Sequence, residues 1–313
     1  MGRPFLRVLS PGALTTVQDL GRYGYLKFGL PPSGCADEFA FRAGNVLVGN
    51  SPGCAGLEMT ILGGKFEFLC DSIFALTGAD MEPKINGAPC PMWRSLKARE
   101  GDILQLSYAK KGCRGYFLVS GGIDVPIVLK SRSTYLACGL GGFEGRALKA
   151  GDALERGEGE AHPGRLIPRE FIPDYPSSLA LKVVMGPQED HFTEEGRAAF
   201  LSQPYTVSPQ SNRMGYRLSG KAIGTLKRGI ISDTVPLGAI QVTGEEQPIV
   251  LLWDRQTTGG YPKIATVIAA DLWKIGQAKP GEVIAFRKVS LEDARSLFRS
   301  FCHFLISLEG LIK

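Results

Sequence analysis

Short apolar runs separated by glycine and proline dominate this chain. Forty glycines and twenty prolines interrupt the runs, and each run has about the length of one β-strand. The clearest runs are Lys65–Leu69, Ile103–Tyr108, Tyr116–Ser120, Leu179–Met185, Ile249–Trp253 and Val283–Arg287. This spacing favours barrels or sandwiches over alternating strands and helices, so the pattern predicts a mainly β fold.

One turn sequence, a glycine followed by an acid before an apolar run, occurs three times. The three copies are Glu100-Gly101-Asp102, Ala150-Gly151-Asp152 and Pro280-Gly281-Glu282. Such residues are ordinary at hairpin turns, but their recurrence in both halves of the chain suggests two related barrels.

Helical spacing is rare, and it is clearest at the C-terminus. Apolar residues recur every three or four positions from Leu291 to Leu305, after a capping box formed by Ser290 and Asp293. The pattern predicts a C-terminal amphipathic helix that packs on a domain or on a partner. Two further helices are expected, at Ala36–Val48, closed by Gly49, and at Phe192–Leu201, with Thr193 as N-cap.

The composition changes between Glu155 and Ser178, where charges and four prolines replace the apolar runs. Such a segment is typical of a linker. We therefore expect one β-barrel domain over residues 1–165, a second over residues 179–290, and the C-terminal helix over residues 291–313.

Overall composition disfavours several classes of protein. The 36 basic and 31 acidic residues give a net charge of +5 and are scattered, which argues against nucleic-acid binding. Seven cysteines include no CxxC pair, and no apolar run reaches the ~18 residues of a membrane span. A cytoplasmic chain with reduced thiols, bound neither to a membrane nor to nucleic acid, is the expectation.

The most informative polar segment is Asp254–Ile268. It holds Arg255, Gln256, Thr257, Thr258, Gly259, Gly260, Tyr261 and Lys263 within nine positions. Arginine offers a permanent forked cation for carboxylate or phosphate, and paired glycines can take backbone angles closed to other residues and admit a ligand to the main chain. A binding loop is therefore favoured over a solvated surface loop.

Two other polar clusters leave alternatives open. Gln18, Asp19 and Arg22 surround Gly21, where they could hold a polar ligand or only stabilise a turn through an exposed ion pair. Asn212 and Arg213 precede a Met-Gly pair, and a solvated strand-edge loop is there nearly as plausible as a binding loop.

Several common catalytic signatures are missing from the sequence. There is no GxxxxGK[ST], no GxSxG, and the run from Gly139 to Glu144 fails GxGxxG at its last position. The three histidines, His162, His191 and His303, are far apart and do not have the spacing of metal ligands. A metal site held by this chain is not expected.

Eight ordered blocks resemble the biotin-dependent carboxyltransferase family, which includes allophanate hydrolase subunit 2-like proteins. The blocks are PGALTTVQDLGRYGY, SGCADEFAFRAGNVLVGN, LTGAD, SGGIDVP with SRSTY, GPQEDHF, SNRMGYRLSG, PLGAIQV and DRQTTGGYPKIATVIAADL. They run from about Val8 to Phe286, so the resemblance covers nearly the whole chain. It implies two cyclophilin-like β-barrel domains. Lys130 stands where the family usually has glycine before SRST. A lysine can alter that turn, so the carry-over of the family's roles to Ser131, Arg132 and Ser133 is weaker than for the other blocks.

The resemblance also implies a function and partners. It points to the C subunit of an ATP-dependent 5-oxoprolinase, which activates 5-oxoproline, by phosphorylation, for ring opening to glutamate. The partners would be a B-like (KipI-like) and an A-like (LamB/YcsF-like) protein, with ATP and Mg²⁺ used by the complex and no covalent biotin on this chain. The chain alone would be nearly inactive.

Site roles follow from that expectation. The catalytic residues would be Arg255, Gln256, Thr257, Thr258 and Lys263. The substrate-binding residues would be Asn212, Arg213, Gly259, Gly260, Tyr261, Gln18, Asp19 and Arg22. Two alternatives remain: the carboxyltransferase component of a urea carboxylase or allophanate-type enzyme, and a non-catalytic antagonist of a KipI-like kinase inhibitor.

Overall fold

The computed structural model describes residues 4–312, which form two compact units. The first unit comprises the chain up to Arg22, Ser33–Tyr175 and the chain from Phe304 onwards; the second comprises Tyr23–Pro32 and Pro176–His303. The boundary between Tyr175 and Pro176 lies inside the segment rich in charge and proline. The domain limits given above stay a prediction.

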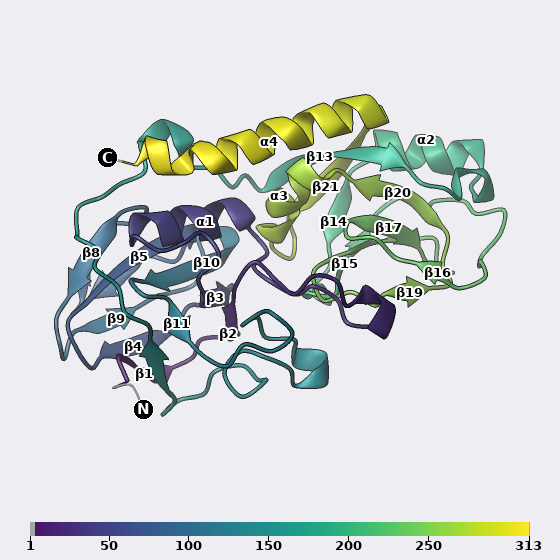
Figure 1. The fold of residues 1–313 in the computed structure, drawn as a ribbon. Coiled ribbons are helices and arrows are strands. Elements are labelled where there is room, and N and C mark those ends of the chain that lie inside the picture. Colours follow the sequence, from purple (N-terminus) through teal and green to yellow (C-terminus); the bar gives the residue numbers. More distant parts are fainter. Residues whose placement is uncertain (1–3, 313) are drawn as a thin grey trace. The chain divides into compact units, whose positions relative to one another are not determined.

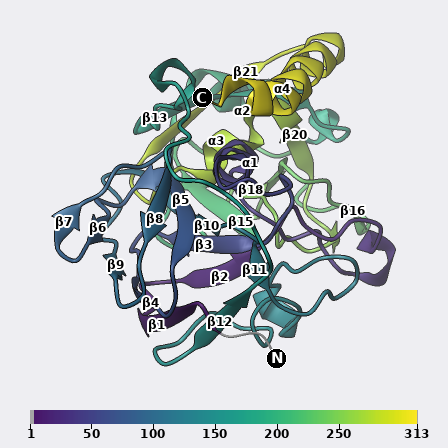
Figure 2. The same ribbon diagram turned by 60° about the vertical axis from the view of Figure 1, so that its left-hand side comes forward.

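The first unit is built from two antiparallel sheets (Figures 1 and 2). The larger sheet has the order β11 (Ile123–Asp124), β12 (Ala153–Arg156), β1 (Leu6–Ser10), β4 (Lys65–Phe68), β9 (Ile103–Gln105), β6 (Lys84–Ile85), β7 (Ala88–Pro89). The smaller sheet has the order β2 (Thr15–Gln18), β3 (Gly56–Thr60), β10 (Lys111–Val119), β5 (Ser72–Asp80), β8 (Ser95–Ala98).

Aromatic side chains fill the core of the first unit. The Phe117 ring of β10 lies 5.6 Å from that of Phe74 on β5, and Phe74 lies 5.2 Å from Phe68 on β4. All three side chains are fully buried, so removing this apolar surface from water stabilises both sheets together. The helix α1 (Glu38–Leu47) packs on β5 and β10.

The second unit is a closed seven-stranded barrel (Figure 1). Its order is β13 (Ser178–Met185), β20 (Lys263–Val267), β17 (Ala239–Val242), β18 (Pro248–Leu251), β15 (Gly215–Ser219), β14 (Tyr205–Val207), β21 (Val283–Lys288). Parallel pairing of β21 with β13 and antiparallel pairing of β21 with β14 close the ring. A short ribbon of β16 (Asp233–Thr234) and β19 (Thr258–Gly259) lies outside this ring.

The three predicted helices are confirmed, and so are the predicted caps Thr193 and Ser290; the N-cap of α1, Asp37, was not predicted. Asp37 caps α1 by accepting from the Ala40 N–H, and Thr193 caps α2 (Glu194–Ser202) by accepting from the Gly196 N–H. In front of α4 (Leu291–Leu311) the Ser290 hydroxyl accepts from the Asp293 N–H at 3.0 Å. These side chains satisfy N–H groups that have no partner within the helix. A short helix, α3 (Leu272–Gly276), is an addition to the predicted set.

The mainly β fold is confirmed, but only one closed barrel is shown. The first unit's strands form the two sheets above, and a second closed barrel is not seen among residues 4–312. Three strand limits were wrong by two residues or more: β9 stops at Gln105, β18 stops at Leu251, and β10 starts earlier, at Lys111. Apolar runs continue past the last ladder pair because loop residues such as Leu252 and Trp253 are also buried.

The three glycine–acid turns share one geometry. Gly101, Gly151 and Gly281 all have φ between 85° and 94°, which favours glycine. In each turn the acid accepts from the N–H three residues before it, at 2.7, 2.7 and 2.8 Å. Two copies lie in the first unit and one in the second. The turn therefore recurs in the structure as well as in the sequence.

Candidate functional site

The polar segment predicted as a binding loop lies in the second unit, between β18 and β20. We call residues 254–263 the arginine loop. Its strand β19 pairs with β16, with Gly259 opposite Asp233 and Thr258 opposite Thr234. The ribbon therefore fixes the backbone of the glycine pair to a neighbouring loop (Figure 1).

An ion pair joins the arginine loop to the Asn212–Arg213 cluster. Arg213 Nε lies 2.9 Å from Asp254 Oδ2, and both side chains are buried. The Asp254 N–H also donates to the Arg213 carbonyl at 3.0 Å. Asn212 accepts from the Met214 N–H at 2.8 Å and shapes the same turn. The paired residues Arg213 and Asp254 lie 41 positions apart in the sequence, so the structure joins two predicted clusters into one site. Within this site, Asp254 neutralises the charge of Arg213.

Arg255 is buried directly after Asp254 in the chain, and no carboxylate pairs with its guanidinium group among residues 4–312. It is 3% exposed, and its Nε and Nη1 donate to the carbonyls of Val235 and Leu252 at 2.8 and 3.4 Å. Among the described residues 4–312, none forms an ion pair with it. Burial lowers the pKa of Arg255 to about 10, and Tyr23 opposes that shift. The side chain is still a cation at neutral pH, and a buried cation of this kind attracts an oxyanion.

Lys263 differs from Arg255 because its charge is already matched. Its Nζ lies 2.7 Å from Asp233 Oδ2, with 3% of the lysine and 46% of the aspartate side chain exposed. The lysine contact is the main cause of a lowered pKa at Asp233. As placed, Lys263 holds the Asp233 loop in position.

Gln241, which is not among the residues predicted from the sequence, connects several loop residues. It is buried on β17, its Nε2 donates to the Tyr261 carbonyl at 3.2 Å, and its Oε1 accepts from Gln256 Nε2 at 3.4 Å. A polar residue at a fully buried position of the apolar strand run AIQV is the signal that could have found it. Thr257 takes part through its main chain, whose carbonyl accepts from the Val235 N–H at 2.9 Å.

The expected reason for the glycine pair, unusual backbone angles, was wrong. Neither Gly259 nor Gly260 has a positive φ. A Cβ at Gly259 would lie 2.7 Å from Gln241 Nε2, whereas one at Gly260 would meet only the Ile230 carbonyl oxygen at 3.6 Å and Ser232 Oγ at 4.0 Å. Gly259 is needed for close packing, and Gly260 leaves open space beside the main chain. Tyr261 is 45% exposed nearby.

The remaining predicted residues form a separate cluster in the first unit, around Asp19. Its Oδ1 accepts from Ser131 Oγ and the Gly21 N–H at 2.7 Å each, and Oδ2 accepts from the Arg132 N–H at 2.6 Å. Ser133 Oγ also donates to Oδ1. Asp19 is 9% exposed, so this carboxylate organises the SRST loop and is saturated with donors.

Gln18 and Arg22 bind the same loop. Gln18 Nε2 donates to the Thr134 carbonyl at 3.3 Å, and Arg22 Nη2 donates to the Ser133 carbonyl. Both side chains are fully buried. Lys130 has φ 63°, the backbone conformation that glycine favours. The lysine therefore keeps the turn, and the loop contacts Asp19 despite the departure from the family pattern.

Between residues 4 and 312, no three His, Cys, Asp or Glu side chains gather closely enough to hold a metal ion. No helix in that range combines the length and apolar character needed to span a bilayer.

Comparisons with known proteins agree over nearly the whole chain. Residues 28–288 match the family described as carboxyltransferase domain, subdomain A and B. The chain is 40% identical to the C subunit of 5-oxoprolinase from Escherichia coli, over 92% of this chain and 93% of that one, and 36% identical to the Haemophilus influenzae protein of the same name, over 93% and 94%. The crystal structure of the Kluyveromyces lactis urea amidolyase superposes with a TM-score of 0.92 at 33% identity, covering 99% of this chain and 20% of that one. The chain belongs to the carboxyltransferase domain family, subdomains A and B, and is a homologue of the 5-oxoprolinase C subunit.

Proposed function

We propose that this chain acts as the C subunit of an ATP-dependent 5-oxoprolinase, together with B-like (KipI-like) and A-like (LamB/YcsF-like) partners. The identity to two such subunits over more than nine tenths of both chains supports the assignment. We place the complex in the cytoplasm and expect ATP with Mg²⁺ to be its substrate. We also expect both units to be cyclophilin-like barrels.

The single observation that carries the chemistry is Arg255. Ring opening of a lactam needs an activated carbonyl, and negative charge develops on the carbonyl and phosphoryl oxygens during activation. Arg255 is a buried cation held by two carbonyl groups, with no carboxylate to neutralise it among residues 4–312. It is the residue of the arginine loop best suited to bind a substrate oxyanion.

The other loop residues support this role in different ways. Gln256, Thr257 and Thr258 supply polar groups beside Arg255, and Gly260 leaves room for a ligand at the main chain. The ion pair of Arg213 and Asp254 fixes the start of the loop, directly before Arg255. We retain Lys263, Tyr261 and Asn212 as proposed site residues, and the Asp19 cluster with Gln18 and Arg22 as a second polar subsite.

The test is an assay of the reconstituted complex. The chain is purified with its B-like and A-like partners, and ATP-dependent conversion of 5-oxoproline to glutamate is followed. Arg255→Ala should lower turnover by about 10²- to 10³-fold, the usual effect of losing one oxyanion donor. Arg287→Ala, at an exposed position of β21 in the same unit, is the matched control and should retain activity. Near-normal turnover of Arg255→Ala would refute the assignment.

A urea carboxylase component is the second candidate, because the fold superposes on the Kluyveromyces lactis urea carboxylase with a TM-score of 0.92. That function would use the same loop to hold urea and a carboxylated carrier. Urea-dependent ATP hydrolysis, measured beside 5-oxoproline turnover with the corresponding partner proteins, distinguishes the two.

A further inference from the structure

A group of exposed apolar side chains lies around the arginine loop in the second unit. The group draws on the arginine loop itself, on the loop between β15 and β16, and on the segment Tyr23–Pro32, which belongs to the same unit. Single exposed apolar side chains are ordinary on a protein, but a group of them marks a binding surface. We call this group the Ile231 face; its members are Tyr23, Leu26, Phe28, Ile231 and Tyr261, between 45% and 94% exposed.

Hydrogen bonds hold two members of the face side by side. The Ile230 N–H donates to the Gly260 carbonyl at 2.9 Å, and Asp233 pairs with Gly259 in the ribbon of β16 and β19. Ile231 therefore lies between two contacts that tie its loop to the arginine loop, and Tyr261 follows Gly260 directly. At 94% exposed, Ile231 is presented to solvent from a fixed backbone.

The short helix η1 (Leu26–Phe28) adds an aromatic part to the face. None of its residues is buried, and the N–H groups of Phe28 and Gly29 donate within the turn, to the carbonyls of Tyr25 and Leu26. Figures 1 and 2 both show this dark purple helix next to the short ribbon that contains β16. The helix therefore presents its apolar side chains beside the arginine loop and does not pack them into a core.

The cations around the face have no acidic partner. Lys227 and Arg228 precede Ile231 in the same exposed loop, and Lys27 on η1 has its Nζ 5.0 Å from the centre of the Phe28 ring. Within residues 4–312, none of these three cations forms an ion pair. Asp233, the nearest acid along the chain from Arg228, is already paired with Lys263. A complementary surface therefore carries acidic as well as apolar side chains.

A protein surface fits these features better than a small molecule does. Small ligands bind in concave pockets that bury most of their surface, whereas apolar side chains ringed by charges are typical of protein interfaces. The function proposed above requires other subunits beside this chain. A subunit on the Ile231 face would also exclude water from the arginine loop, where the charge of Arg255 then acts more strongly on a substrate.

We propose that the Ile231 face binds another subunit of the 5-oxoprolinase complex, which presents acidic and apolar side chains to it. Ile231 and Phe28 are the apolar anchors, and Lys227 and Arg228 pair with carboxylates of that subunit. The inference rests on the proposed function, because that function supplies the partner. It also explains why the chain alone is expected to be nearly inactive.

Binding of the separately purified B-like and A-like proteins to the full chain tests the proposal. Calorimetric titration measures the dissociation constant of each. Ile231→Asp and Phe28→Asp should each weaken the subunit that binds by at least about tenfold, as expected for interface anchors. Ile127→Asp, at a position of the first unit that is 61% exposed, is the control and should bind normally. Because Ile231 is exposed, its replacement should leave the thermal unfolding midpoint of the free chain unchanged.

Charge reversal tests the acidic character of the partner. Arg228→Glu should weaken binding by at least about tenfold at low salt, and by less in about 0.5 M NaCl, because salt screens exposed charges. Arg287→Glu, at an exposed position of β21 in the same unit, is the control and should bind normally. An acidic partner surface is excluded if Arg228→Glu binds as tightly as the unmodified chain.

Three results would overturn the proposal: neither protein binds, Ile231→Asp and Phe28→Asp both bind like the unmodified chain, or the face joins two copies of this chain. Sedimentation equilibrium of the chain alone shows the last case, as a dimer that Ile231→Asp makes monomeric. Failure of the proposed function is a different result. A subunit would then bind through the Ile231 face, but the mixed subunits would not convert 5-oxoproline to glutamate.

Discussion

Arg213 and Asp254 form a two-point ion pair inside the second unit. Nε lies 2.9 Å from Oδ2 and Nη2 lies 3.3 Å from Oδ1, and the two side chains are 6% and 9% exposed. The next residue, Arg255, is equally buried and has no such partner among residues 4–312. One arginine therefore holds the loop, while the other is available to a ligand.

Breaking the pair should destabilise the protein. In Asp254→Asn, Arg213 would stay buried without its carboxylate, which typically costs about 3–5 kcal/mol. Replacing both residues, as Arg213→Met with Asp254→Leu, should cost less than the single change. Urea unfolding measures both. The exposed pair of Lys110 and Glu82 is the control, and Glu82→Gln should cost below about 1 kcal/mol.

Arg255→Met should separate stability from function. The methionine removes a buried cation that lacks a carboxylate, but it also removes the donors to the Val235 and Leu252 carbonyls, so the free energy of unfolding should fall by no more than about 1–3 kcal/mol. Turnover of the reconstituted complex should nevertheless fall by about 10²- to 10³-fold. A large loss of stability in thermal unfolding would instead assign Arg255 a structural role.

The two glycines of the arginine loop should respond differently to alanine. Gly259→Ala forces the buried Gln241 amide to move and to lose its bond to Tyr261, at a cost of about 1–3 kcal/mol. Gly260→Ala should change stability by less than about 0.5 kcal/mol, because its Cβ would enter open space. Activity of Gly260→Ala then reports whether a ligand approaches the main chain there. Equal loss of stability in both variants would contradict the packing described.

The ion pair of Asp233 and Lys263 should make the free energy of unfolding depend on pH in the acid range. The lysine lowers the pKa of Asp233 below its ordinary value of 3.8, so the stabilising contribution is complete above that value. It is lost as the pH falls through the lowered pKa, because the protonated acid no longer pairs with Lys263. Urea midpoints should therefore differ between Asp233→Asn and the unmodified chain at about pH 6, and the difference should shrink towards about pH 2. A constant difference would exclude this carboxyl as the cause.

The amino-acid sequence determined those features that depend on neighbours along the chain. Asp37, Thr193 and Ser290 cap the helices because an N-cap side chain bonds to a backbone group three residues away. The glycine–acid turns are equally local. The order of the motifs also identified the family, since it is read directly from the chain.

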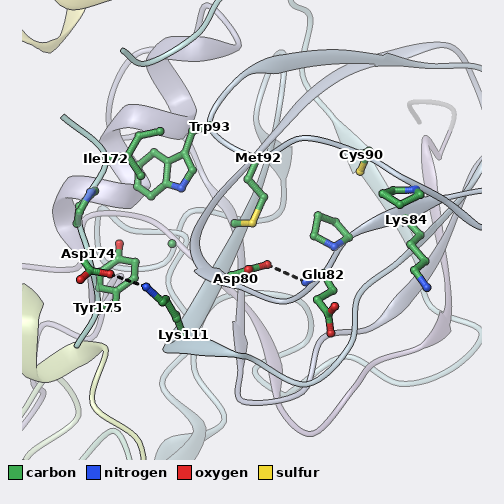
Figure 3. A pocket seen from close by; sticks show the side chains of 14 residues that line it. Asp80, Glu82, Lys84, Cys90, Met92, Trp93, Lys111, Ile172, Asp174 and Tyr175 are labelled. Atoms are coloured by element: carbon green, nitrogen blue, oxygen red, sulfur yellow. Dashed lines mark hydrogen bonds and ion pairs between the residues drawn. The ribbon is translucent and has the colours of Figure 1, made fainter. Parts of the chain in front are cut away.

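Only the tertiary structure decided how charges and packing divide among the site residues. The sequence shows Arg213 and Arg255 as similar polar residues, but pairing across 41 positions neutralises the first and burial isolates the second. Gln241 and the reason for Gly259 also depend on contact between β17 and the arginine loop. The pocket lined by Trp93 and Tyr175 (Figure 3) is likewise formed by segments that are distant in the sequence, from Gly78 to Tyr175. Long-range contacts of this kind set which groups are desolvated or matched, and no local pattern encodes them.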